Sequence, residues 1–255
     1  TGHSDLIVWA DGKAALYRRG VELAKDSGLA EVSGAISVAV GDYDNDGLAD
    51  LAVLTEDGPR LFHNNKGKFE AQQANLPKGR FEKAVWVDFD HDYDLDLLLF
   101  GAKSVLLRNQ GTAGFVDRSA DFPFQAGEAM DAVPFRLMKD SKSLDVVVSY
   151  ADHAGVTYRD DLAGHYSAEP VGALPSGARG LRVADVNHDG WLDVVFSSGE
   201  LINKQGKLEA GQRRGDLASV DADFDGEGRG DSAAVRSDGS MVTRLNRGEF
   251  KERWR

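Results

Sequence analysis

Four short segments of the sequence place carboxylate or amide side chains at alternate positions and end in an aspartate. We call residues 42–50, 88–96, 185–193 and 223–231 the first, second, third and fourth acidic loops. Positions 1, 3, 5 and 9 hold Asp42, Asp44, Asp46, Asp50; Asp88, Asp90, Asp92, Asp96; Asp185, Asn187, Asp189, Asp193; and Asp223, Asp225, Glu227, Asp231. Calcium takes about six to eight oxygen ligands in a flexible geometry. Oxygens at alternate positions of a wrapped loop converge, so the pattern predicts calcium sites.

The remaining loop positions fit the same chemistry. Position 7 would add a backbone carbonyl, from Leu48, Asp94, Trp191 and Arg229. Position 6 needs a positive φ and is glycine in three loops, whereas the second loop has Tyr93 there. Magnesium is the weaker candidate, because it prefers octahedral geometry and sheds water reluctantly. We therefore expect about four bound calcium ions, one in each loop.

Two other readings of the loops were weighed. An EF-hand needs a glutamate at position 12, where this chain has Val53, Leu99, Phe196 and Ala234. Acidic residues are also common in ordinary solvated turns. A solvated turn does not explain four such loops in register with a repeat, and clustered carboxylates repel one another without a cation. His91 and His188 occupy position 4 and are predicted to point to solvent.

Two repeats depart from the loop pattern. The stretch ahead of Asp145 aligns Leu137, Lys139 and Ser141 with positions 1, 3 and 5, so we expect no calcium there. Lys139 is predicted to place its ammonium near the position of the missing ion. Ahead of Asp5 only Thr1–Ser4 remain, so that loop is incomplete.

The elements that position these loops form a repeat. The aspartates at 5, 50, 96, 145, 193 and 231 each precede a short apolar run, at intervals of 38 to 49 residues. Short runs rich in Val, Leu and aromatic residues, bounded by Gly, Asp and Asn, are typical of strands. A unit of about 45 residues with four short strands is typical of a propeller blade. We predict an all-β propeller of about six to seven four-stranded blades, with the first unit incomplete. A β-sandwich or an irregular solenoid is the alternative.

The loop residues resemble the FG-GAP/VCBS repeats. The similarity is carried by Asp42 to Leu54, by Asp185 to Phe196 and by the second loop, and it extends over essentially the whole chain. The resemblance implies an integrin-α-like propeller with cation loops, of a kind that serves in adhesion, as lectins, as partner platforms or beside catalytic domains. No nucleophile–base motif such as Gly-x-Ser-x-Gly is present.

Composition narrows the function further. The chain has 255 residues, a formal charge of −12 and no cysteine, which argues against nucleic-acid binding, disulfides and thiolate sites. We interpret residues 1–255 as one propeller domain, processed or excised from a longer chain, because the sequence opens without methionine or a signal peptide. We predict a non-enzymatic, calcium-binding adhesion or interaction module that binds a protein or glycan at the cell surface, outside the cell or in the periplasm. The alternative is a lectin-like or ancillary propeller of an extracellular carbohydrate-active enzyme.

Overall fold

The computed structural model describes residues 5–18, 22–213, 216–222, 231–236, 241–246 and 250–254, with side chains described up to residue 213 except those of Leu6 and Ala10. Within these residues the chain forms six antiparallel sheets in sequence order. One sheet has three strands and five have four. Three single-turn 3-10 helices, η1 (Leu29–Glu31), η2 (Gly111–Ala113) and η3 (Ser119–Asp121), lie in the connections. No helix among the described residues is both long and apolar enough to cross a membrane.

The first three sheets are built from consecutive strands. The first sheet contains β1 (Leu6–Ala10), β2 (Lys13–Arg18) and β3 (Glu22–Leu23). The second sheet contains β4 (Ala35–Gly41), β5 (Asp50–Thr55), β6 (Gly58–Asn65) and β7 (Lys68–Gln72). The third sheet contains β8 (Lys83–Val87), β9 (Asp96–Phe100), β10 (Val105–Asn109) and β11 (Phe115–Asp117).

The last three sheets repeat this four-stranded plan. The fourth sheet contains β12 (Ala129–Phe135), β13 (Asp145–Tyr150), β14 (Gly155–Asp160) and β15 (Tyr166–Val171). The fifth sheet contains β16 (Arg182–Ala184), β17 (Asp193–Phe196), β18 (Gly199–Asn203) and β19 (Leu208–Arg213). The sixth sheet contains β20 (Asp216–Ala222), β21 (Asp231–Arg236), β22 (Met241–Asn246) and β23 (Phe250–Trp254).

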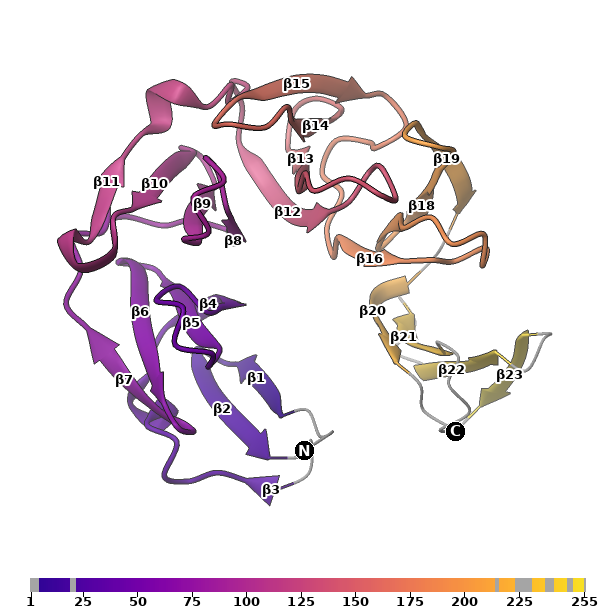
Figure 1. Ribbon diagram of the computed structural model, residues 1–255. Helices are drawn as coiled ribbons and strands as arrows, with labels where there is room; N and C mark the ends of the chain where they lie inside the picture. Colours follow the sequence, from indigo (N-terminus) through magenta and orange to yellow (C-terminus); the bar gives the residue numbers. More distant parts are fainter. Residues whose placement is uncertain are drawn as a thin grey trace.

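The sheets are the blades of a propeller. They follow one another around an open arc, with the first strand of each four-stranded sheet on the inner side and the fourth on the outer side (Figure 1). The inner strands β4, β8 and β12 are spatial neighbours. The predicted all-β propeller is confirmed. The predicted number of six to seven four-stranded blades is wrong for the described residues, which form five.

The incomplete first unit explains part of this difference. The apolar run of β1 follows Asp5 as the apolar run of β5 follows Asp50, so β1 to β3 correspond to the second, third and fourth strands of the other sheets. In the described residues, the first sheet therefore has no counterpart of the inner strand that precedes an acidic loop elsewhere.

Burial on both faces explains why the second strands β5, β9, β13 and β17 are mostly apolar. Side chains alternate between the two faces of a strand. In β5, Leu51 and Val53 join the core shared with the first sheet, whereas Ala52 and Leu54 join the core shared with the third sheet. β9 behaves in the same way between the second and fourth sheets. The aspartate that precedes each such strand is therefore held at a fixed place against a packed interior.

Candidate cation-binding loops

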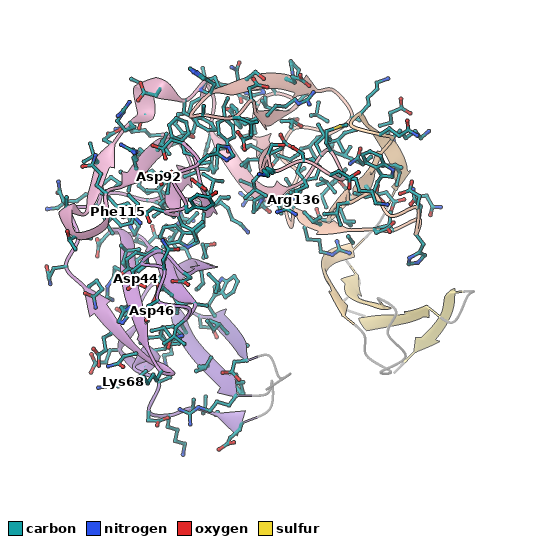
Figure 2. All side chains as sticks on the ribbon, in the orientation of Figure 1. Asp44, Asp46, Lys68, Asp92, Phe115 and Arg136 are labelled. Carbon is teal, nitrogen blue, oxygen red and sulfur yellow. The ribbon has the colours of Figure 1, made fainter. Side chains whose placement is uncertain are left out.

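The acidic loops join the first and second strands of their sheets. The first loop connects β4 to β5, the second connects β8 to β9, and the third connects β16 to β17. Figure 2 shows Asp44 and Asp46 of the first loop and Asp92 of the second at these connections. Because the sheets repeat one topology, all three loops lie at the same edge of their blades.

The aspartate at position 9 is a clamp for backbone N–H groups. Asp50 accepts hydrogen bonds from Tyr43 N (3.3 Å) and from Asn64 N (2.7 Å). The same pair of bonds recurs in the other sheets and is made by Asp96 with Phe89 N (2.8 Å) and Asn109 N (2.7 Å), and by Asp193 with Val186 N (3.0 Å) and Asn203 N (2.8 Å). All three aspartates are fully buried. This residue therefore fixes the loop to the third strand whether or not an ion is bound.

The first loop gathers three carboxylates near its turn. Asp42 accepts hydrogen bonds from Asp46 N (3.1 Å) and Gly47 N (2.9 Å), and Gly47 has the positive φ of 86° that position 6 requires. One oxygen from each of Asp42, Asp44 and Asp46 lies within 4.8 Å of the others. Asp50 approaches Asp44 but not this whole group. The wrapped backbone thus brings together the oxygens of positions 1, 3 and 5, as the spacing predicted.

His63 was missed by sequence reasoning. It lies in the third strand, with Nδ1 at 3.0 Å from Asp44 Oδ2 and 3.4 Å from Asp50 Oδ1. His63 lies outside the sequence motif of the first loop, because only the pairing of β5 with β6 brings its side chain close to Asp44 and Asp50.

The second loop gathers a different set of carboxylates. Asp88, Asp90 and Asp96 place one oxygen each within 4.8 Å of the others. Asp88 Oδ1 and Asp90 Oδ1 are buried and have no hydrogen-bond partner in the described part of the chain. A buried carboxylate oxygen without a partner is unfavourable, and a hard cation would satisfy it. These residues therefore fit a calcium ion.

Arg108 was also missed by the sequence analysis. Its Nε lies 2.5 Å from Asp90 Oδ2, and its Nη2 donates to Asp92 Oδ2 at 3.0 Å. Asp92 is thereby turned toward Arg108 and is not part of the three-carboxylate group.

The third loop has the same turn but fewer carboxylates. Asp185 accepts hydrogen bonds from Asp189 N (3.2 Å) and Gly190 N (2.9 Å), as Asp42 does in the first loop. Asn187 donates through its side-chain amide to Asp189 Oδ2 at 3.0 Å. Asp185, Asp189 and Asp193 do not place three oxygens within 4.8 Å of one another. Of the fourth loop, Asp223, Asp225, Glu227 and Arg229 lie outside the described residues, as does the side chain of Asp231.

Comparison with known proteins agrees with these loops. The FG-GAP-like repeat family matches residues 1–53 and 42–99, which include the first and second loops. Residues 1–99 are FG-GAP repeats. The family resemblance drawn from the loop residues is thereby confirmed for residues 1–99. No curated protein sequence matches the chain.

Several solved structures share the propeller fold with these FG-GAP repeats. One is a lectin of Agrocybe aegerita that recognises non-reducing terminal N-acetylglucosamine, with TM-score 0.62, 18% identity and coverage of 98% of this chain and 75% of that chain. Another is BBS1N, solved in complex with ARL6DN, with TM-score 0.61, 14% identity, and coverage of 100% and 77%. Sqt1 of Saccharomyces cerevisiae gives TM-score 0.53, 12% identity, and coverage of 97% and 69%. At these identities the likeness establishes the fold.

Burial changes the acidity of the clamp aspartates and of Asp88. It raises the pKa of Asp96 to about 7, and the neighbouring Asp90 and Asp92 charges add to this while two backbone hydrogen bonds oppose it. Burial also raises the pKa of Asp50, Asp88 and Asp193 above the usual range. A cation beside these carboxylates would favour their charged forms.

The fourth sheet retains the aspartate at position 9 and its two backbone hydrogen bonds, but it lacks the set of carboxylates that the first and second loops have at positions 1, 3 and 5. Asp145 accepts hydrogen bonds from Leu137 N (2.9 Å) and Asp160 N (3.1 Å), the same two bonds as in the first, second and third acidic loops. Leu137 therefore occupies position 2, and Arg136, directly after β12, occupies the place of Asp42 and Asp88. The sequence alignment had put Leu137 at position 1, because this connection is one residue longer. Figure 2 shows Arg136 at this position.

Lys139 does not fill the place of the missing ion. A Cβ added to Gly190 would lie 2.6 Å from Lys139 Nζ, so the ammonium reaches the backbone of the third loop in the next sheet.

Position 4 connects neighbouring blades. Asn45 has a φ of 59° and donates to Asp94 Oδ1 of the second loop at 2.8 Å. His91 has a φ of 62°, and its Nε2 lies 3.0 Å from Asp160 Oδ2 in the fourth sheet. The prediction that His91 points to solvent is therefore wrong, since its side chain is 28% exposed and paired.

A pocket of about 330 Å³ lies beside the second loop, between the third and fourth sheets. It is lined by Phe89, Asp90, Arg108, Arg118, Asp121, Ala163, Gly164 and His165. Arg118 pairs with Asp121 and Arg108 with Asp90, so the lining offers both hydrogen-bond donors and acceptors.

Proposed function

We propose that this chain is a calcium-binding, non-enzymatic propeller that presents a rigid surface to a protein or glycan. The observation that carries the calcium part is the convergence of carboxylate oxygens in the first and second loops. The second loop adds two buried oxygens without hydrogen-bond partners in the described residues. Asp42, Asp44 and Asp46, and Asp88, Asp90 and Asp96, would hold the ions, with about four ions expected over all loops.

Calcium would act on stability. An ion bound to the folded chain alone stabilises it by about 2.7 kcal/mol per site at a free concentration of 100 times Kd. The test is thermal unfolding with calcium and with excess chelator, together with titration calorimetry. A higher midpoint in calcium and saturable heats would support the proposal. An unchanged midpoint without binding heat would overturn it.

The non-enzymatic part rests on how the carboxylates are used. The clamp aspartates each accept two backbone hydrogen bonds, and three carboxylates in each of the first and second loops place one oxygen each within 4.8 Å of the others. A carboxylate held in this way is a poor general acid. The rigid, repeated blades are suited to displaying variable loops to a partner.

A protein or glycan partner outside the cell suits the charge and the metal. The formal charge of −12 disfavours nucleic acid, and calcium sites of about 10⁻⁴–10⁻³ M affinity are typical of extracellular modules. We place the chain at the cell surface, outside the cell or in the periplasm. Surface plasmon resonance on immobilised glycans, with calcium and with chelator, tests whether the chain binds a glycan.

The second candidate is a lectin-like or ancillary propeller of a carbohydrate-active enzyme. The mixed-charge pocket of about 330 Å³ favours it, because that volume and lining suit one sugar ring. Saturable binding to N-acetylglucosamine-terminated glycans without turnover would support a lectin. Release of reducing sugar from polysaccharide by the chain would overturn the non-enzymatic assignment.

A further inference from the structure

One position in the third strand differs in charge among the sheets. Asn64, Asn109, Asp160 and Asn203 each donate a backbone N–H to the clamp aspartate, so they occupy equivalent places. The residues directly before them are His63, Arg108, Arg159 and Ile202. This position therefore carries a titratable ring, a guanidinium, a second guanidinium and an apolar side chain in turn.

In the third sheet, this residue enters the acidic loop. Arg108 lies 2.5 Å from Asp90 through Nε and 3.0 Å from Asp92 through Nη2, and its side chain is 27% exposed. Asp90 is one of the three carboxylates that converge in the second loop. Arginine stays charged at all relevant pH values and presents its N–H groups in a fixed fork. The second loop thus already contains a counter-ion that belongs to the chain.

The other sheets give the comparison. His63 approaches Asp44 and Asp50 in the first loop but has only one nitrogen near them. Ile202 beside the third loop is apolar, so it supplies no charge. Lys139 reaches that loop at Gly190 and forms no ion pair with its described carboxylates. Arg159 lies beside a connection that has lost its cage and pairs with Glu169 at 3.4 Å.

We propose that Arg108 is a tethered counter-ion that lowers the calcium affinity of the second loop below the affinity that its carboxylates would otherwise give. This inference rests on the proposed calcium binding. A divalent cation at Asp88, Asp90 and Asp96 must either displace the guanidinium from Asp90 or bind beside a like charge. Either event opposes binding. We expect removal of the charge to tighten binding at the second loop by about tenfold or more.

The test uses variants of the full chain that remove the charge at position 108 or introduce a charge at position 202. Arg108→Met removes the charge and keeps an apolar stem, whereas Ile202→Arg introduces the charge beside the third loop. Arg108→Lys keeps the charge, and Arg118→Met removes a nearby arginine that pairs with Asp121 and not with the loop. Circular dichroism checks the fold of each variant.

Calcium calorimetry and terbium luminescence provide the readouts. Trp191 lies inside the third loop and Tyr93 inside the second, so the terbium emission lost in Trp191→Phe and in Tyr93→Phe reports each loop, whereas Trp86, stacked on Tyr43, contributes to the remaining signal. A Tyr93→Phe background identifies the second-loop contribution. We expect Arg108→Met to tighten the second-loop site by about tenfold and to enlarge the calcium-dependent rise in melting temperature. We expect Ile202→Arg to weaken the Trp191 signal, and Arg108→Lys and Arg118→Met to resemble the wild type.

The outcomes separate the two proposals. If the wild-type chain binds calcium and Arg108→Met leaves binding at the second loop unchanged, the role of Arg108 is overturned while calcium binding stands. If Arg118→Met tightens binding as much as Arg108→Met, general surface charge explains the effect and the specific role is also overturned. If neither the wild type nor Arg108→Met binds calcium, both proposals fail.

Discussion

Asp145 provides a direct test of the clamp, because its loop has lost the cation cage. Its side chain is 2% exposed, and its two oxygens accept hydrogen bonds from Leu137 N and Asp160 N. Asp145→Ala would leave both N–H groups buried and unpaired. Each unsatisfied buried group costs about 1–3 kcal/mol, and burial of the aspartate charge offsets part of this, so we expect a destabilisation of about 2–4 kcal/mol.

The assay is urea unfolding of the whole chain, in calcium and in excess chelator. The loss in the free energy of unfolding should be the same in both, because Asp145 is not expected to ligate an ion. Asp140→Ala is the matched control, since Asp140 is exposed in the same connection and should change stability by less than about 0.5 kcal/mol. A loss below about 1 kcal/mol for Asp145→Ala, or a loss that appears only in calcium, would refute the clamp.

The other predictions concern pH, backbone strain and the contact between blades. Burial raises the pKa of Asp145, so between its ordinary and raised values the folded chain binds more protons than the unfolded chain. The free energy of unfolding should therefore fall as pH rises through that window, and Asp145→Asn should flatten this slope in thermal melts in chelator. Tyr93 is 84% exposed at a φ of 74°, so Tyr93→Gly should stabilise the chain by up to about 1 kcal/mol in urea, while Tyr93→Ala should not. Asn45→Ala removes the bond to Asp94 and should destabilise the chain by about 1 kcal/mol in the same assay; no change would mean that this contact does not contribute.

The sequence was sufficient to predict the blades and the turns of the loops. Apolar runs after a recurring aspartate predicted the second strands, since those strands are buried on both faces, as Leu51 and Ala52 are. The spacing of Asp42, Asp44 and Asp46 predicted their convergence, because it depends on one local turn. The local sequence pattern is enough to predict a structural feature that depends only on contacts between residues close in sequence.

Contacts across strands and sheets could not be predicted in this way. Arg108 and His63 reach their loops only through the register of the third strand, and His91 reaches Asp160 only because two sheets pack together. The misplacement of Leu137 has a similar cause, since one added residue shifts the alignment while the hydrogen bonds to Asp145 keep the true register. The number of four-stranded blades was also beyond the sequence, because the first repeat has no counterpart of the inner strand in the described residues.

The clamp also explains why an aspartate precedes the second strand even where no ion is expected. In the second loop, Asp96 has one oxygen for Phe89 N and one for Asn109 N, and it also belongs to the cluster with Asp88 and Asp90. In the fourth sheet, Asp145 keeps both backbone bonds although Arg136 stands at position 1. The backbone bonds therefore require the aspartate independently of the cation. It follows that a repeated aspartate at position 9 indicates a blade, whereas the acids at positions 1, 3 and 5 are the residues on which the proposed cation binding depends.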